Sequence, residues 1–394
     1  MSKQELFYIE PFMRGVQHAP FNAAMLQVVQ RIYPKATIQL WCSNDHFLAI
    51  KEQSPLSLQI VHRTLNIPAL LQANKTRWVY KHLMECWLLT KLLIQAKRKK
   101  VDLVYFSFLS PPAQWLLSRY RTFFFKKLSI VVQLHGLSLL KATKQMKSTD
   151  RIYARLLRGA FRWKTSFLYY IVLEKGAQRY LQQQQLIPTS HLIYIPHPYI
   201  FKKHAIRQKK EGVLTLVHLG VARLSKGSSQ FFELAYRFKE EIKRHQVVFK
   251  VIGRVLPEMD NYLNTYVVYP KNKEMLSVAE YQEALNGADY ALFCYDSDNY
   301  ELTSSGSLMD AIAAYKPILA LRNPSFSELF SIVPHPPGQL FADLTEMEAY
   351  IRSMLDLQLR TNEATESAFM VLQTHFGIDN VAKELNEHLK RIVC

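Results

Sequence analysis

A loop with two glycines and two cations follows one apolar run in the second half of the chain. After VLTLVHL (213–219) come Gly220, Arg223, Lys226 and Gly227, and then an amphipathic stretch. Glycine permits a tight turn, a guanidinium can bind two phosphate oxygens, and a lysine adds a point charge just before a predicted helix N-terminus. The pattern indicates a diphosphate site. The alternative is a solvated basic loop, and the spacing differs from the phosphate loop G-x-x-x-x-G-K-[ST].

A second polar loop follows the apolar run DYALFCY (289–295). In it, Ser304, Ser305, Gly306 and Ser307 open a predicted helix. Hydroxyls, unpaired backbone N–H groups and the helix dipole together favour an anion at such a place. Asp310 lies one turn later, where it could accept hydrogen bonds from a ribose diol. Ordinary helix capping needs only one serine, so three serines around a glycine favour a ligand.

Candidate residues in the first half are fewer. His135 follows the apolar run LSIVVQL (128–134), and a neutral histidine there could accept a proton or orient a hydroxyl. A structural histidine is the alternative. Gly15 could let a phosphate approach the backbone or could serve only as a turn glycine, and His18 follows it closely.

Short apolar runs alternate with amphipathic stretches along most of the chain. They include ATIQLWC, VDLVYFSF, LSIVVQLHG, SFLYYIVL and HLIYIP in the first half, and GVLTLVHLG, VVFKVIG, NTYVVYP, DYALFCYD and KPILALR in the second. Strands that alternate with helices predict parallel sheets covered on both faces. We therefore expect an α/β fold with two Rossmann-like domains that face a cleft.

A segment rich in Pro and Lys, residues 196–212, has no apolar period and is predicted to be a linker. The domains are accordingly expected at residues 1–200 and 201–375. The last residues show Val381, Leu385 and Leu389 at four-residue spacing, which is one face of a helix. We expect 376–394 to form a C-terminal helix that packs across the domains and returns to the first one.

Positive charge is concentrated in the first half. Residues 1–200 hold 28 Lys and Arg against 8 Asp and Glu, whereas residues 201–394 hold 22 against 24. The first half should therefore be attracted to anionic lipids, phosphate-bearing molecules or nucleic acid. Residues 75–100 mix Trp, Leu and Lys, and residues 141–162 place basic side chains at three- and four-residue steps, so we expect both to contact an anionic membrane surface. An ordinary solvated helix face is the alternative.

Three segments of the second half, in this order, resemble the nucleotide-sugar-binding domain of GT-B glycosyltransferases: HLGVARLSKGSSQFFELA, VVFKVIG and SSGSLMDAIAAYKPILA. The likeness is to the retaining, family-4-like enzymes of bacterial exopolysaccharide, capsule and lipopolysaccharide assembly. In the first half, PFMRGVQHAPFNAAML and LSIVVQLHGLSLL resemble the glycine loop and the histidine-ending strand of that fold. The resemblance implies an acceptor-side N-terminal domain and a donor-binding C-terminal domain.

The resemblance also implies roles for individual residues. Gly15 and His18 would lie on the acceptor side, and His135 and Glu301 would be catalytic. The family has two glutamates separated by seven residues; here Asp310 stands at the second position and Leu302 at the first, with Glu301 one residue earlier. The donor-binding set implied by the resemblance consists of Gly220, Arg223, Lys226, Gly253, Arg254, Ser304, Ser305, Gly306, Ser307 and Asp310.

The expected activity is transfer of a sugar from a UDP- or GDP-linked donor to a hydroxyl of a lipid-linked glycan acceptor, with retention of configuration. We expect a cytoplasmic protein, peripheral on the inner face of the membrane, because the chain shows neither a signal-peptide core nor a spanning apolar stretch. We expect no cofactor and no metal, since Arg223 and Lys226 would neutralise the diphosphate and DSD (296–298) reads as turn chemistry. The alternatives are a nucleic-acid-binding protein and a catalytically silent GT-B scaffold.

Overall fold

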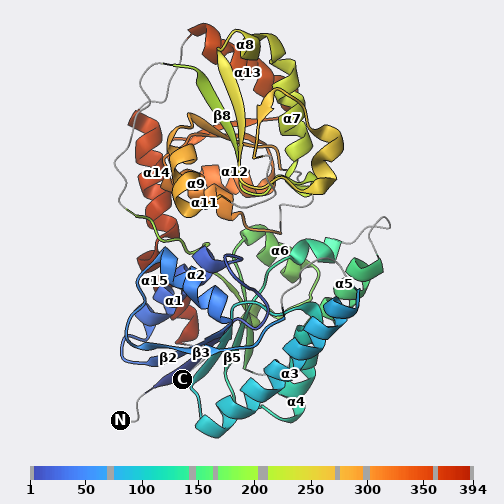
Figure 1. Ribbon diagram of the computed structural model, residues 1–394. Coiled ribbons are helices and arrows are strands. Elements are labelled where there is room, and N and C mark those ends of the chain that lie inside the picture. Colours follow the sequence, from blue (N-terminus) through green and yellow to red (C-terminus); the bar gives the residue numbers. More distant parts are fainter. Residues whose placement is uncertain are drawn as a thin grey trace. The chain divides into compact units, whose positions relative to one another are not determined.

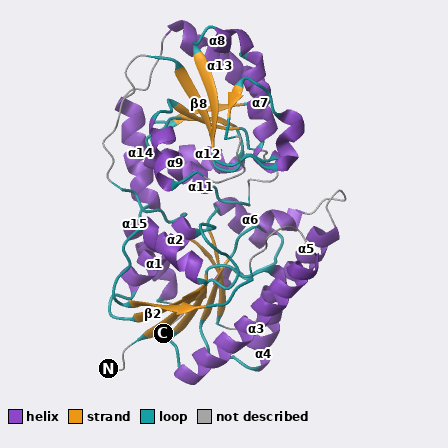
Figure 2. Ribbon diagram, viewed as in Figure 1, coloured by secondary structure: helices purple, strands orange, loops and turns teal. Residues whose placement is uncertain are grey.

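The computed structural model describes the chain in eight stretches: residues 4–68, 75–141, 148–162, 167–202, 212–270, 276–295, 302–357 and 363–390. The chain divides into two compact units. Met1–Ile200 and Phe376–Cys394 form the N-terminal unit, and Phe201–His375 forms the C-terminal unit. Each unit holds a sheet of parallel strands between helices (Figures 1 and 2). The predicted α/β fold with two Rossmann-like domains is confirmed.

Seven parallel strands form the sheet of the N-terminal unit, in the order β3-β2-β1-β4-β5-β6-β7. Their bounds are β1 Glu5–Ile9, β2 Thr37–Cys42, β3 Ile60–Thr64, β4 Leu103–Phe106, β5 Ile130–Gln133, β6 Leu168–Val172 and β7 Leu192–Tyr194. The order reverses direction between β1 and β4. In open α/β sheets, ligands bind beyond the carboxyl ends of the strands at such a reversal.

The helices of the N-terminal unit cover both faces of this sheet (Figure 1). They are α1 Ala19–Ile32, α2 Asn44–Gln53, α3 Lys75–Lys99, α4 Pro111–Phe123, α5 Ser148–Phe161, α6 Lys175–Gln183 and α15 Ile378–Leu389, with the 3₁₀ turns η1 Leu137–Lys141 and η2 Thr189–His191. Among the described helices, none combines the length and the apolar character that crossing a membrane requires.

The C-terminal helix α15 packs on α1 in the N-terminal unit. Val381, Leu385 and Leu389 lie fully or nearly fully buried in the core cluster that also contains the apolar side of α1. An ion pair of 2.5 Å joins Arg31 to Asp379 at the rim of this contact. The predicted return of the C-terminal helix to the first domain is therefore confirmed.

Six parallel strands form the sheet of the C-terminal unit, in the order β10-β9-β8-β11-β12-β13. Their bounds are β8 Leu214–Leu219, β9 Val247–Ile252, β10 Val267–Val268, β11 Tyr290–Phe293, β12 Ile318–Leu321 and β13 Gly338–Phe341. This is the strand order of the first six strands in the other unit. The reversal here lies between β8 and β11.

The helices of the C-terminal unit are α7 Ser228–Arg237, α8 Lys239–Lys243, α9 Val278–Asn286, α11 Gly306–Ala313, α12 Pro324–Ser331, α13 Leu344–Leu357 and α14 Glu363–Phe376, with η3 Leu224–Lys226 and η4 Pro257–Tyr262. Helix α7 buries Phe231 and Phe232 against the sheet, beside Phe249 of β9. Burial of each aromatic ring stabilises the unit by about 1.5–3 kcal/mol.

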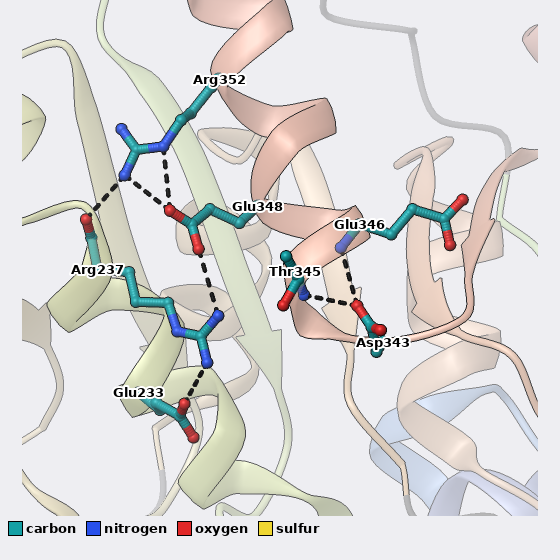
Figure 3. Close-up of polar contacts among 7 residues, drawn as sticks. All are labelled: Glu233, Arg237, Asp343, Thr345, Glu346, Glu348 and Arg352. Carbon is teal, nitrogen blue, oxygen red and sulfur yellow. Dashed lines mark hydrogen bonds and ion pairs between the residues drawn. The ribbon is translucent and has the colours of Figure 1, made fainter.

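Ion pairs hold α13 to α7 (Figure 3). Arg237 donates to Glu348 at 3.3 Å and also pairs with Glu233, and Arg352 donates to Glu348 at 2.9 Å and to the carbonyl oxygen of Arg237 at 3.0 Å. The carboxylate of Asp343 accepts the N–H groups of Thr345 and Glu346, which begins α13. These contacts tie α7 to α13.

Candidate functional site

Two loops meet at the carboxyl ends of β8 and β11, the reversal point of the C-terminal sheet. Gly220 directly follows β8, and Tyr295 lies two residues after β11. Because ligands of doubly wound folds bind at this point, the side chains gathered here are the first candidates for a binding site.

Glycines allow the backbones of this region to touch. Gly253, after β9, has a φ of +146°, and a Cβ there would lie 2.1 Å from the carbonyl oxygen of Gly220. Gly227 has a φ of +63°, and its Cβ would lie 1.7 Å from the carbonyl oxygen of Cys294. Only glycine fits either position. The loop after β8 is therefore pressed against both neighbouring strands.

Lys226 reaches from this loop to the second one. Its ammonium lies 3.2 Å from the hydroxyl oxygen of Ser307, and a Cβ on Gly220 would lie 3.2 Å from the same ammonium. The phenol of Tyr295 bonds to the hydroxyls of Ser305 at 2.8 Å and Ser307 at 3.0 Å. The structure thus brings together Gly220, Lys226, Ser305 and Ser307, although they come from loops about eighty residues apart.

Helix α11 begins at this cluster. Ser305 is its N-cap and accepts the N–H of Leu308 at 3.4 Å, so this serine does cap the helix. Capping does not account for Ser307, whose hydroxyl faces Lys226. Gly306, the first helical residue, is exposed, and a Cβ there would meet nothing within 4 Å. A ligand can therefore approach the N–H groups of this helix start.

The environment of Lys226 disfavours its charge. Burial, followed by the charge of Arg223, lowers the pKa of this ammonium to about 8, although Asp310 acts in the opposite direction. An anion bound beside Lys226 would raise this pKa and so favour the protonated form. A cation held in this way, next to a helix N-terminus, is suited to binding a phosphate group.

Two residues behind the loop were not predicted. The hydroxyl of Ser228, fully buried at the start of α7, accepts the N–H of Arg223 at 2.9 Å and bonds to Nε2 of His218 at 2.8 Å. Burial, followed by the charge of Lys226, lowers the pKa of His218 to about 3, so this ring is neutral. The pair fixes the backbone at Arg223. Neither residue has a spacing signal in the sequence.

The other residues of the expected donor set have different surroundings. Asp310 accepts the phenolic hydrogen of Tyr281 at 2.9 Å. The backbone oxygen of Arg254 accepts the N–H of Ala222 at 2.8 Å, which ties the segment after β9 to the loop. Ser304 is half-buried just before the cap.

Leu302 and Glu301 are the two residues compared with the family's first glutamate. Leu302 is 3% exposed, so this position belongs to the apolar core. Glu301 lies outside the described residues.

In the N-terminal unit, a buried carboxylate organises the reversal point between β1 and β4. Glu10 follows β1, is 0% exposed, and accepts the N–H groups of Phe12 and Met13 at 3.1 and 3.0 Å. Its other oxygen accepts the hydroxyl of Ser107, after β4, at 2.7 Å. Glu10 therefore positions both loops and was not predicted.

Three histidines gather beside these loops. The rings of His18 and His135 have centroids 4.7 Å apart, and Phe21 contacts both His135 and His197. Burial lowers the pKa of all three, to about 4 for His197 and well below the ordinary range for His135. The rings are thus neutral at neutral pH. Two of the predicted residues, His18 and His135, are brought together.

Hydrogen bonding sets the tautomer of His135. Its Nε2 lies 3.1 Å from the carbonyl oxygen of Ser107, which can only accept, so Nε2 carries the hydrogen. Nδ1 is therefore the basic nitrogen. This arrangement leaves a proton acceptor at the end of β5.

The loop that carries Gly15 is held from α2. The N–H of Gly15 donates to Asp45 at 3.0 Å, and Nδ1 of His46 donates to the carbonyl oxygen of Gly15 at 2.7 Å. Asn22 in turn donates to Nε2 of His46 at 2.8 Å. Gly15 has a φ of +53° and His18 a φ of +58°, so two left-handed residues turn the chain into α1.

Lys81 is a further unpredicted residue near these loops. It is 4% exposed, and its ammonium lies 3.9 Å from the centre of the Phe12 ring. Burial lowers its pKa, against the opposing charges of Glu85 and Glu10. It lies seven residues before Leu88, on the buried face of α3, but a lysine there has the type of a surface residue. Among the described residues, no three His, Cys, Asp or Glu side chains gather in a way that could hold a metal ion.

Comparison with known proteins supports the fold. No family sequence model matches the chain, and no curated protein matches its sequence. Solved structures do match it. Sucrose-phosphate synthase from Thermosynechococcus elongatus is 11% identical with a TM-score of 0.70, and the match covers 99% of each chain.

Two further structures match over nearly the whole length. HepE from Anabaena, in complex with UDP and glucose, is 13% identical with a TM-score of 0.65, covering 98% of this chain and 99% of its own. The lipopolysaccharide outer core galactosyltransferase WaaB is 11% identical with a TM-score of 0.63, covering 98% and 99%. With its two parallel-sheet units, the chain therefore has the GT-B fold of these glycosyltransferases.

Proposed function

We propose that the chain is a glycosyltransferase that moves a sugar from a UDP- or GDP-linked donor to a hydroxyl of a lipid-linked glycan. The single observation that carries the proposal is the approach of Lys226 to Ser307, beside Gly220 and at the start of α11. It puts an ammonium, two hydroxyls and helix N–H groups at the reversal point of one sheet. A nucleotide diphosphate supplies the negative charge that this combination lacks.

The proposed chemistry at this site is stabilisation of the leaving group. As the bond between the sugar and the diphosphate breaks, negative charge grows on the bridging oxygen. Lys226, Arg223 and the N–H groups of α11 would bind the transition state, in which this charge has grown, more strongly than the intact donor. This difference lowers the activation barrier of transfer. This account uses neither a cofactor nor a metal ion.

In the N-terminal unit, we assign the acceptor to the loops around Gly15, His18 and His135. The neutral His135, with Nδ1 as its basic nitrogen, would accept a hydrogen bond from the reacting hydroxyl. Glu301 remains a proposed catalytic residue. Retention of configuration is proposed from the resemblance, and the anomeric form of the product, read by NMR, tests it.

We propose that the protein acts at the cytoplasmic face of a membrane. The supporting observation is the surplus of 20 positive charges in residues 1–200, compared with the near-neutral remainder. A lipid-linked acceptor and an anionic surface would hold the enzyme at the same place.

A thermal-shift screen of the full chain tests the donor assignment. HepE was solved in complex with UDP and with UDP-glucose, so UDP, UDP-glucose, GDP and GDP-mannose are the first probes, with ATP as the comparison. A ligand at about 100 times its dissociation constant adds about 2.7 kcal/mol of stability. We expect such a shift with UDP- or GDP-linked ligands and not with ATP.

Matched variants make the screen specific to the site. Lys226→Met should reduce the ligand-induced shift, because it removes the ammonium. Lys243→Met, on exposed α8, should leave the shift intact. Absence of any nucleotide-induced shift in the wild type, or an undiminished shift in Lys226→Met, would refute the assignment.

A further inference from the structure

Helix α3 is apolar on two opposite sides. One side, which includes Leu89, Leu92 and Leu93, is buried in the N-terminal unit. The other side is exposed and carries Tyr80 (55%), Leu83 (64%), Trp87 (54%) and Ile94 (41%). These four recur at steps of three, four and seven residues, so they form one stripe along the helix. An exposed stripe of this size on a helix that already has a buried face indicates a second contact.

The stripe runs into a groove between α3 and α4. The groove has a volume of about 690 Å³, and its lining includes Ile94, Lys97, Arg98, Tyr120, Phe124 and Phe125. The two helices lie side by side (Figures 1 and 2). The groove has the size of a small-molecule site, and its walls are mostly aliphatic and aromatic. Phe124 is 61% exposed at its mouth.

The segment that forms the groove carries mostly positive charge. Residues 75–141 contain 13 Lys and Arg but only two acidic residues, Glu85 and Asp102. Glu85 is buried and accepts the N–H of Ser110, and Asp102 accepts the N–H of Glu5. Both carboxylates are thus bonded to backbone N–H groups. The excess of cations along the groove favours an anionic partner.

The cations lie against the apolar surface. The ammonium of Lys97 is 3.1 Å from the carbonyl oxygen of Phe124 and 5.8 Å from the centre of the Phe125 ring. The ammonium of Lys91 is 5.2 Å from the centre of the Trp87 ring. Aliphatic stems and aromatic rings that carry cations at their edge suit the boundary between lipid chains and headgroups.

We propose that this groove binds one acyl chain of an anionic phospholipid, with the lipid phosphate against Lys97 and Arg98, and that the exposed stripe of α3 lies in the membrane interface. Charge complementarity selects this occupant. A second copy of the chain would bring two strongly basic faces together, which is unfavourable. The inference deepens the proposed membrane placement and rests on it, but it is independent of donor binding.

Flotation of the full chain with vesicles tests the inference. Vesicles of phosphatidylcholine alone are compared with vesicles in which about one lipid in three is phosphatidylglycerol. We expect binding to the second kind only. The double variant Ile94→Ser and Phe124→Ser changes two exposed side chains and should lower the vesicle partition constant about tenfold. Lys97→Gln with Arg98→Gln should lower it by a similar factor.

Further measurements separate insertion into the groove from adsorption by charge. Phospholipids brominated on the acyl chain should quench the fluorescence of Trp87, and the quenching should be lost in the groove variant. Trp87→Phe identifies the signal, and Met370→Ser, at a 56% exposed position on α14, is the matched control that should float like the wild type. Unchanged flotation and quenching in the groove variant would overturn the inference.

Two other outcomes have distinct meanings. A dimer in sedimentation without lipid, abolished by the groove variant, would assign the face to a second copy and overturn the inference. If the wild type floats with neither vesicle, the inference and the membrane placement both fail. Donor binding is measured separately, by UDP titration without vesicles, so glycosyl transfer can stand or fall independently of these results.

Discussion

The ammonium of Lys226 lies 3.2 Å from the hydroxyl oxygen of Ser307, although 81 residues separate the two in the chain. Their approach depends on β8 and β11 being neighbours in the sheet, because each loop leaves the carboxyl end of one of these strands. The basic loop and the serine-rich loop are thus one feature of the structure. A diphosphate bound beside Lys226 and Ser307 would contact both.

The lowered pKa of Lys226 predicts how donor binding depends on pH. Phosphate binds the protonated ammonium, and in the free protein the pKa is about 8. Above pH 8, the affinity for UDP should therefore fall, approaching about tenfold per pH unit. Calorimetric titration with UDP from about pH 7 to 9.5 measures this, and Lys226→Met should bind more weakly with a flat profile over the same range.

The same shift predicts an opposite trend in the stability of the free protein. The folded-state pKa of Lys226, about 8, lies below its ordinary value of 10.5, so between these values the unfolded chain binds more protons. The contribution of this group to the free energy of unfolding should rise with pH through that window. Denaturant unfolding of wild type and Lys226→Met compares the two slopes; equal slopes would contradict the burial of the ammonium.

Gly306 predicts a change in binding without a change in stability. A Cβ at this position would meet nothing within 4 Å, so Gly306→Ala should leave the free energy of unfolding within about 0.5 kcal/mol of wild type. The added methyl would stand where the proposed diphosphate approaches the helix N-terminus. We therefore expect the Kd for UDP to rise about tenfold, as measured by calorimetry. Gly287→Ala, at the end of α9, should change neither quantity.

Substitution of Gly253 is expected to lower stability first and to weaken binding as a consequence. An alanine here would place Cβ 2.1 Å from the carbonyl oxygen of Gly220, at a φ of +146°. The backbone must shift, so Gly253→Ala should lower the free energy of unfolding by about 2 kcal/mol or more. Because the shift displaces Gly220, UDP binding should weaken too. A variant as stable as the wild type would show that these two backbones do not touch.

The fold could be predicted largely from the apolar runs, but three strands were missed. β3 and β13 were missed because their short runs, IVHRT and GQLF, mix polar with apolar residues. The central strand β1 was missed because Glu10 ends its short run. A charged residue there reads as a break, whereas in the fold Glu10 is buried and satisfied by two N–H groups and Ser107.

Some residues of the candidate site could also be predicted from the sequence, and others could not. Gly220, Lys226 and Ser307 could be found because glycines, cations and serines at loop positions signal anion binding. Tyr295 could not, because a tyrosine at the end of an apolar run has the pattern of a core residue. Its role depends on the distance from its phenol to the serine hydroxyls, which only the packed sheet determines.

His135 supports a final prediction about catalysis. As a proton acceptor for the reacting hydroxyl, it should contribute about 10²- to 10⁴-fold to turnover, so His135→Asn should lower kcat by such a factor with little change in the KM for the donor. Burial holds the pKa of His135 well below its ordinary value of 6.5, and therefore its protonation should not reduce the rate between about pH 6 and 8. Release of UDP from a UDP-sugar, followed by chromatography, measures both quantities. His245→Asn, at an exposed left-handed position that asparagine tolerates, is the control and should retain wild-type turnover. A wild-type rate that falls through an apparent pKa near 6.5, with this limb absent in His135→Asn, would show instead that His135 titrates as an ordinary exposed histidine.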